Sequence, residues 1–178
     1  MERMKIREAV LGDYTELMDF YAYMCIVLNG EDFLPHGNKG GFPSAEMVSD
    51  AIKDQNLFVE IEDDKIVGAI IMNHECDEAY HTVSWGIDAP DDQVVILHAL
   101  RILPKYSGQG YAKKLIQYSI EKAKERNLKA IHLDVIEGND IPLRMYGSFG
   151  FQYVDTVEMC YEDIGEARKF RLMELLLR

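Results

Sequence analysis

The sequence predicts one mixed domain of the α/β or α+β class, and three observations support that class. Its 178 residues fit a single compact domain of ordinary size. Apolar residues make up 48% and charged residues 28%, proportions that allow a well-packed core in a soluble protein. Short β-rich runs alternate with segments of helical periodicity, and a strand–helix–strand unit lies near the centre, at residues 93–136. We therefore treat residues 1–178 as one domain.

Two helices and three strands are expected in the N-terminal half. In chain order, the segments are a strand at 5–10, a helix at 11–29, a loop at 31–43, a helix at 44–54, and strands at 57–62 and 65–73. Tyr14, Leu17 and Tyr21 show the spacing of three and four that predicts the first helix. Ser44 is a sound N-cap for the second helix. The pair Asp63-Asp64 between the two strands indicates a hairpin.

The C-terminal half is expected to alternate strands and helices. In chain order, the segments are a polar, turn-rich stretch at 75–92, a strand at 93–103, a helix at 110–126, a strand at 130–136, a helix at 139–149, and strands at 151–159 and 169–177. The apolar run at 93–103 suggests a strand buried on both faces. Pro142 and Asn139 suit the start of their helix, the first in the opening turn and the second as its N-cap.

Charge and cysteine usage exclude several classes of protein. Lys plus Arg total 19 and Asp plus Glu total 31, so the net charge is −12, which disfavours nucleic acid and anionic membranes as partners. The longest apolar runs, such as 66–72, are far too short to span a membrane, and the N-terminal residues lack the apolar run of a signal peptide. Cys25, Cys76 and Cys160 contain no C-x-x-C pair, so we expect reduced thiols, no metal and a cytoplasmic protein.

The densest chemical signal is the segment 100–115, where a buried strand runs into a glycine-bearing turn that opens a long helix. Gly108 and Gly110 allow the backbone to approach a ligand closely, and the helix start adds partial positive charge. Lys113 and Lys114 add further positive charge in the first turn. The segment therefore predicts a site for phosphate or pyrophosphate, and a glycine turn that only starts a helix fits it equally well.

Two common nucleotide-binding motifs do not fit this segment. The P-loop string G-x-x-x-x-G-K-[ST] does not occur in the sequence. The dinucleotide fingerprint G-x-G-x-x-G fails at its third glycine, where Lys113 stands, and the repeated strand–helix array around it is missing. A nucleotide-binding domain is therefore a weaker interpretation, one that predicts binding of ATP or NAD.

The same turn carries a pattern that is similar to a known signature. Pro104 ends the strand, and residues 107–112 then read Ser-Gly-Gln-Gly-Tyr-Ala. This resembles the acetyl-CoA motif [Q/R]-x-x-G-x-[G/A] of the GCN5-related N-acetyltransferases, the GNAT family. Gly110 and Ala112 match the motif, whereas Ser107 replaces the usual Gln or Arg. Because main-chain amides bind the pyrophosphate in that family, the replacement weakens the match without removing the site.

A second motif of the family is present in full. Asn139, Tyr146 and Gly150-Phe151 give the pattern N-x₆-Y-x₃-G-F, and the strand–helix order agrees with the family over essentially the whole chain. The resemblance implies the GNAT fold, a mixed and mostly antiparallel sheet flanked by helices on both faces. Its central parallel strands, 94–103 and 130–136, would splay at the cofactor turn.

The resemblance also implies acetyl-CoA as the co-substrate and assigns residues to it. The main chain of Leu100, Arg101 and Ile102 would pair with the pantetheine arm like an added strand. The residues expected to cradle the pyrophosphate are Gly108, Gln109, Gly110, Tyr111, Ala112 and Lys113. Asn139 would hydrogen-bond the cofactor arm, and Tyr146 would lie near its sulfur.

Transfer of an acetyl group to an amine requires a base, an oxyanion donor and an acid. An alkyl ammonium has a pKa of roughly 10, so its proton must leave before the nitrogen attacks the thioester directly. An amide at the strand end suits the oxyanion, and Tyr146 is the expected general acid. The base is left open among Glu137, His98, Glu75 and a water chain. His132, in contrast, is expected to be a core residue.

The acceptor class and the assembly state also stay open. A primary amine of a small molecule, a polyamine or aminoglycoside-like amine, or a peptide or protein amino group would each serve. An acyl-CoA-binding sensor or interaction module that has lost catalysis is the alternative, and Ser107 is the one feature that favours it. Dimers are common among similar proteins, so a homodimer is a further expectation to test.

Overall fold

The structure is a computed structural model that describes residues 4–28, 42–161 and 166–178. The strands of its sheet are β1 (Lys5–Glu8), β2 (Leu57–Glu62), β3 (Lys65–Asn73), β4 (Val94–Ile102), β5 (Ala130–Ile136), β6 (Gln152–Met159) and β7 (Arg168–Leu176). The α-helices are α1 (Tyr14–Leu28), α2 (Ala45–Lys53), α3 (Tyr111–Glu125) and α4 (Asp140–Ser148). Short 3-10 helices are η1 (Leu11–Asp13), η2 (Glu78–Thr82), η3 (Asp91–Gln93) and η4 (Pro104–Tyr106).

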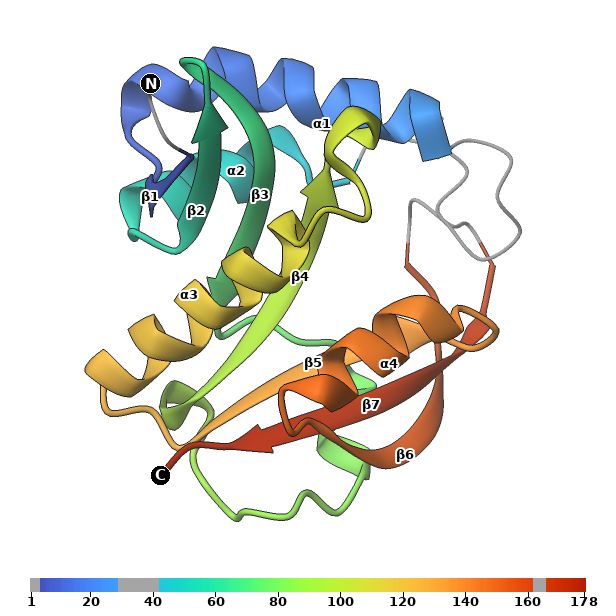
Figure 1. The fold of residues 1–178 in the computed structure, drawn as a ribbon. Coiled ribbons are helices and arrows are strands. Elements are labelled where there is room, and N and C mark those ends of the chain that lie inside the picture. Colours follow the sequence, from blue (N-terminus) through green and yellow to red (C-terminus); the bar gives the residue numbers. More distant parts are fainter. Residues whose placement is uncertain (1–3, 29–41, 162–165) are drawn as a thin grey trace.

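The sheet is mixed and mostly antiparallel, as the sequence predicted. Its strand order is β1-β2-β3-β4-β5-β7-β6 (Figure 1). All neighbouring strands pair antiparallel except β4 and β5, which run parallel. Because β4, α3 and β5 follow one another in the chain, this parallel pair is the expected strand–helix–strand unit.

Helices cover both faces of the sheet (Figure 1), and two of the three hydrophobic clusters among the described residues lie under these helices. Under α3 and α4, Phe58, Leu115 and Ile131 are buried in one hydrophobic cluster. Under α1 and α2, Leu17 and Val48 belong to a second cluster. Each fully buried side chain of this size contributes about 1.5–3 kcal/mol to folding. These two clusters pack the helical layers against the sheet, and a third, containing Tyr80, lies beside them. No helix in the described ranges has both the length and the apolar character needed to cross a bilayer.

The parallel strands β4 and β5 separate along their length. They pair only at their beginnings, where Ile96 opposite His132 is the last matched position. Further along β4 the register with β3 shifts, and Ala99 has a φ of 54°, which marks a β-bulge with an extra residue on β4. The splay expected from the family resemblance is therefore present, and it divides the sheet at its centre.

The splay corrects one expectation about the strand at 93–103. Its first half is buried, as predicted, but from His98 to Ile102 the side chains are partly exposed apart from Ala99. The reason is that β5 has moved away on one side, so this half of β4 borders an open space instead of a packed core. The strand itself spans Val94–Ile102.

Local sequence signals account for most element boundaries. The Ser44 hydroxyl accepts a hydrogen bond from the Met47 amide at 3.1 Å and caps α2 as predicted. Asp63 and Asp64 adopt φ values of 50° and 60°, the left-handed conformation of a tight hairpin turn. Asn139 stands at the N-cap position of α4, but its side chain makes no capping hydrogen bond, so that part of the prediction was wrong.

Other boundaries differ by a few residues from those expected. The first strand ends at Glu8, before residue 10, because Asp13 folds back and accepts a hydrogen bond from the Val10 amide at 2.8 Å. The expected helix at 11–29 begins as η1 and continues as α1 from Tyr14. Most of the expected loop at 31–43 lies outside the described residues.

Candidate active site

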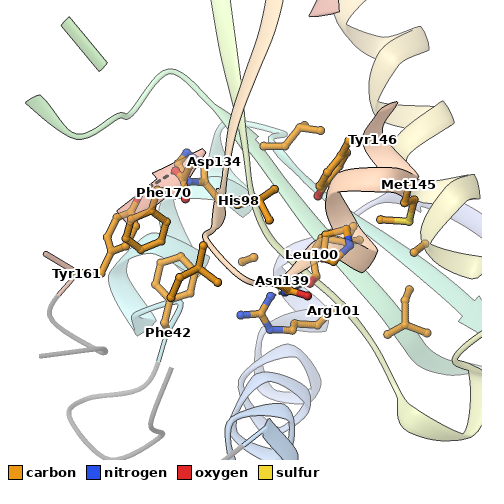
Figure 2. Close-up of a pocket in the computed structure, with 17 residues that line it drawn as sticks. Phe42, His98, Leu100, Arg101, Asp134, Asn139, Met145, Tyr146, Tyr161 and Phe170 are labelled. Carbon is orange, nitrogen blue, oxygen red and sulfur yellow. Dashed lines mark hydrogen bonds between the residues drawn. The ribbon is translucent and has the colours of Figure 1, made fainter. Parts of the chain in front are cut away.

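The splay between β4 and β5 opens a cavity of about 330 Å³ (Figure 2). The predicted site residues that line it are His98, Leu100, Arg101, Ile102, Ala112, Asn139 and Tyr146. Those that lie outside its lining are Glu75, Gly108, Gln109, Gly110, Tyr111, Lys113 and Glu137. Residues from β4, β5, α3 and α4 thus surround one cavity, which lies where β4 and β5 are no longer paired.

The glycine turn at the start of α3 presents main-chain donors to solvent. Gly108 and Gly110 have φ values of 74° and 88°, a conformation that favours glycine. A Cβ added at either position would meet no atom within 4 Å, so the space above the turn is open. The first hydrogen bond of the helix joins the Lys114 amide to the Gly110 carbonyl at 3.2 Å. The amides of residues 111–113 precede it and have no acceptor within the helix, so the turn fits a pyrophosphate.

Two side chains of this turn are held by protein groups. The Gln109 amide donates to the Lys105 carbonyl at 2.9 Å. The Tyr111 hydroxyl donates to the Glu62 carboxylate, and this hydrogen bond is the main reason why the pKa of Tyr111 rises to about 12. With these side chains engaged, each residue would offer a ligand its main chain.

Tyr146 reaches the cavity from α4. Its ring is buried and packs edge-to-face on Phe151, with ring centroids 5.5 Å apart. In Figure 2 its hydroxyl points into the cavity. Burial raises the pKa of Tyr146 far above that of a free phenol, so the hydroxyl keeps its proton at neutral pH and can act as a donor.

His98 lines the cavity from β4, but its surroundings make it a weak base. Its Nε2 atom lies 2.9 Å from the Glu75 carbonyl oxygen. Because a carbonyl only accepts, Nε2 carries the hydrogen and Nδ1 keeps the lone pair. Burial lowers the pKa of His98 to about 4, although the hydrogen bond to Glu75 opposes this change. Glu75 therefore acts here through its main chain and fixes the tautomer of His98.

Asp134 is a cavity residue that the sequence reasoning missed. It lies on β5 two positions after His132, on the same face, and its Oδ2 atom accepts hydrogen bonds from the hydroxyls of Tyr80 at 2.6 Å and Tyr161 at 2.8 Å. Burial raises the pKa of Asp134, and the two phenols partly offset that rise. The available signal was the one carboxylate in a strand whose other residues are apolar except for His132, whereas the sequence left the base open among Glu137, His98, Glu75 and a water chain.

Glu137 does not reach the cavity. It is exposed just beyond the end of β5, and its main-chain amide donates to the Lys169 carbonyl at 2.9 Å. Asp134 and His98, in contrast, each follow the last paired position of the parallel strands by two residues, and so face the same side of the splayed strands. The structure therefore brings together Asp134, His98 and Tyr146.

Aromatic rings close the side of the cavity near Asp134. Phe42, Tyr161 and Phe170 line it there (Figure 2), and Tyr161 packs edge-to-face on Phe170 with centroids 5.2 Å apart. Phe42 lies far from Tyr161 and Phe170 in the sequence, so no local pattern predicted that the three would meet. They give the cavity an apolar wall beside its carboxylate.

Comparison with known proteins agrees with this fold. The sequence model of the acetyltransferase (GNAT) family matches residues 28–151. The chain therefore belongs to the GNAT acetyltransferase family, a class of acetyl-CoA-dependent acyltransferases. The predicted fold and family are both confirmed.

The individual proteins similar to this chain share less than a third of their residues with it. The ribosomal protein bS18-alanine N-acetyltransferase of Haemophilus ducreyi is 29% identical over 87 residues, which are 49% of this chain and 60% of that relative. The chain thus matches less than two thirds of that relative's length. An acetyltransferase of the GNAT family from Streptococcus pneumoniae has a TM-score of 0.76 at 20% identity, over 99% of this chain and 100% of that one. Arabidopsis thaliana NAA60 in complex with acetyl-CoA has a TM-score of 0.71 at 15% identity, over 98% and 100%. These two structures share the fold.

Proposed function

We propose that the chain transfers the acetyl group of acetyl-CoA to a primary amine inside the cavity between β4 and β5. The observation that carries this proposal is the meeting of Asp134 and Tyr146 around one space. One is a carboxylate with a raised pKa, and the other is a phenol that keeps its proton. These are the two proton-transfer groups that amide formation from a thioester requires.

The donor would be held by the glycine turn and by β4. The main-chain amides at 108–113 suit the pyrophosphate, and the exposed half of β4 offers Leu100, Arg101 and Ile102 to the pantetheine arm. Asn139 lines the cavity with a side chain that makes no capping bond to α4, so its amide would be available to bind the arm. Gly110 and Ala112, the two matches to the family motif, lie at the start of α3 beside this route.

Asp134 is the proposed base and Tyr146 the proposed acid. Asp134 accepts the proton that the amine nitrogen must lose, directly or through water, as the new C–N bond forms. A main-chain amide at the Ala99 bulge, where the pairing with β3 is interrupted, donates to the developing oxyanion. When the C–S bond breaks, Tyr146 gives its proton to the sulfur. No covalent bond to the protein is needed.

The relatives support an amino group as the acceptor but do not identify the molecule that carries it. The name of the Haemophilus ducreyi relative gives the alanine of a ribosomal protein as its acceptor, and this supports an amino group of a peptide or a small molecule for this chain. Cys25, Cys76 and Cys160 are all free thiols, which fits the expected cytoplasmic location. The expected homodimer is tested by measuring the mass of the purified protein in solution.

The test is turnover of acetyl-CoA with a panel of primary amines. Because Cys160 is exposed and would react with thiol reagents, product formation should be followed by mass spectrometry. We expect CoA release that depends on an added amine and equals the amount of N-acetyl product. Tight acetyl-CoA binding with no turnover on any amine would instead support the sensor alternative. Preference for ATP or NAD over CoA would overturn both.

A further inference from the structure

Arg101 is the one arginine or lysine among the described residues that line the cavity. It follows the bulge on β4, with its guanidinium drawn inside the site in Figure 2. Its Nη1 atom donates to the adjacent Leu100 carbonyl at 2.8 Å. A guanidinium carries five N–H donors in a planar fork, so most of the donor capacity of Arg101 is unused by the part of the chain that the structure describes.

Unlike Arg7 and Arg171, Arg101 has no acidic partner among the described residues. Arg7 lies 2.7 Å from Asp13 and Arg171 lies 3.0 Å from Asp140. No carboxylate of the described residues lies within 4.0 Å of Arg101, although the chain has 31 acidic residues. A half-buried cation without a partner costs free energy, and a site that binds an anion accounts for retaining it.

The two opposite charges of the cavity act on the same hydroxyl. Burial is the main cause of the raised pKa of Tyr146, but Arg101 lowers that pKa and Asp134 raises it. Both charges are therefore close enough to Tyr146 to influence the place where acetyl transfer would occur. A ligand beside Tyr146 would meet a carboxylate from β5 and a guanidinium from β4.

We infer that the acceptor amine also carries a carboxylate, and that Arg101 binds this carboxylate while the amine lies at Asp134. This inference rests on the proposed function and narrows its acceptor class to amino acids and related amino-carboxylates. A zwitterion matches the pair of opposite charges. Polyamines and aminoglycoside-like amines would bring additional cations towards Arg101 and are disfavoured.

The spacing of the two groups bears on the acceptor's shape. Arg101 is three residues beyond His98, which faces the same side of the splay as Asp134, and a strand rises about 3.3 Å per residue. The side chain of Arg101 is long enough to bring its guanidinium part of the way along β4 towards His98. Acceptors with a short or a long separation between amine and carboxylate, such as α-amino acids and ω-amino acids, are therefore both compatible with the cavity. Phe42, Tyr161 and Phe170 form an apolar wall, which favours an apolar body between or beside the charged ends.

A carboxylate suits Arg101 better than a phosphate does. The planar fork of a guanidinium binds a carboxylate with two parallel hydrogen bonds. The phosphates of the donor have their own predicted site at the glycine turn of α3. A phosphate on the acceptor would carry up to two negative charges, and Asp134 would repel it more strongly than a carboxylate. The singly charged carboxylate is therefore the anion that the cavity fits.

The experiment compares matched acceptors on the full-length protein. The panel contains the proteinogenic α-amino acids, ω-amino acids of increasing length and short dipeptides, each beside its decarboxylated amine or its amide. For the best acceptor we expect kcat/KM to exceed that of the partner lacking the carboxylate by about 10-fold or more, because a hydrogen bond to a charged group is worth about 1.5–3 kcal/mol.

Three variants then assign that preference to Arg101. In Arg101→Gln the KM for the carboxylated acceptor should rise about 10- to 100-fold, and the ratio of kcat/KM between this acceptor and its carboxylate-free partner should fall towards one. Arg101→Lys should recover part of the preference, since it keeps the charge but not the fork. Arg144→Gln is the matched control, because Arg144 is exposed on α4 outside the cavity lining.

Each contrary result has its own meaning. Equal kcat/KM for acceptors with and without a carboxylate would overturn the inference and leave the proposed acetyltransferase function standing. A rise in the KM for acetyl-CoA with every acceptor in Arg101→Gln would also overturn it, because Arg101 would then bind the donor. Absence of turnover with every amine would overturn the proposed function and this inference together.

Discussion

The indole of Trp85 stacks on the imidazole of His132, with ring centroids 3.5 Å apart and planes 10° from parallel. Burial lowers the pKa of His132 despite the opposing effect of Glu174, so the ring is neutral at neutral pH. Its Nε2 atom donates to the Glu174 carboxylate over 2.8 Å. The other oxygen of that carboxylate accepts the Gly86 amide at 2.8 Å. The turn-rich segment after β3 is thereby fixed to β5 and β7.

The same segment reaches Asp134, the proposed base. The Trp85 indole N–H donates to the Tyr80 carbonyl at 2.8 Å, and the Tyr80 hydroxyl donates to Asp134 at 2.6 Å. Trp85 therefore holds the backbone of the residue whose side chain orients the proposed base. Nothing in the sequence around Trp85 predicted this chain of contacts, because its partners are far away along the chain.

Replacing Trp85 tests whether this contact supports catalysis. In Trp85→Ala the stack and the indole hydrogen bond are lost, so the free energy of unfolding should fall by about 1–3 kcal/mol. Because Tyr80 then positions Asp134 less firmly, kcat should fall about 10-fold while the KM for acetyl-CoA stays the same. Trp85→Phe, which keeps a stacking ring, should be intermediate. Normal kcat at reduced stability would restrict Trp85 to a structural role.

The glycine turn could be predicted from the sequence, whereas the proposed role of Asp134 could not. Residues 107–112 are consecutive, so their turn, the positive φ values of Gly108 and Gly110 and the helix start follow from local chemistry alone. Asp134 gains its character from Tyr80 and Tyr161, which are 54 and 27 residues away. Only the folded chain brings those phenols together. The strands and helices were likewise predictable from periodicity, but the burial that lowers the pKa of His98 was not.

Asp134→Asn should remove the base. An asparagine keeps the shape but cannot accept the proton, so kcat should fall by about 10²- to 10⁴-fold with a circular dichroism spectrum like that of the wild type. Since the basic form is the ionised one and burial raises its pKa, wild-type kcat/KM should decline as the pH falls through that raised pKa. The variant should lack this decline.

Tyr161→Phe provides the matched control for that pH profile. The Tyr161 hydrogen bond lowers the pKa of Asp134, so its removal should raise the pKa and shift the decline of kcat/KM to higher pH. Retained kcat in Asp134→Asn, or an unshifted profile in Tyr161→Phe, would argue that another group accepts the proton.

Tyr146→Phe should separate catalysis from binding. The ring and its packing on Phe151 remain, but the hydroxyl that would protonate the leaving sulfur is lost. We expect kcat to fall by about 10²-fold or more, with the Kd for acetyl-CoA changed by less than about 3-fold. Titration calorimetry and steady-state kinetics measure the two quantities. A large loss of affinity with normal turnover would remove Tyr146 from the role of acid.

Gly110→Asp should weaken the binding of acetyl-CoA. The substitution forces a side chain into the left-handed conformation of this residue, whose φ is 88°, and adds negative charge where the pyrophosphate is expected. We expect Kd to rise about 10-fold or more. Gly12→Asp is the control, because Gly12 is also exposed and its added Cβ would meet no atom within 4 Å. Unchanged affinity in Gly110→Asp would contradict our assignment of the pyrophosphate site.

Glu60 is a buried carboxylate on β2 whose charge should cost stability. Both of its carboxylate oxygens are buried and accept no hydrogen bond from the described residues. Burial raises its pKa to about 7, with Lys114 acting against that rise and Glu62 adding to it. The folded state therefore holds a proton that the unfolded chain loses near its ordinary pKa of 4.5. The contribution of Glu60 to the free energy of unfolding must then decrease from about pH 4.5 to about pH 7 and stay low above that range.

Glu60→Gln should remove this pH-dependent loss. A neutral amide carries no charge to desolvate, so at pH 8 the variant should be more stable than the wild type by roughly 1–3 kcal/mol. Below pH 4.5 the two should be nearly equal, because Glu60 is then protonated in both states. Glu158→Gln, at an exposed position on β6, changes the net charge equally and controls for long-range electrostatics. Urea unfolding across pH 4–8 measures the difference, and a wild type that is more stable than Glu60→Gln at pH 8 would mean that the carboxylate is ionised and compensated in the folded protein.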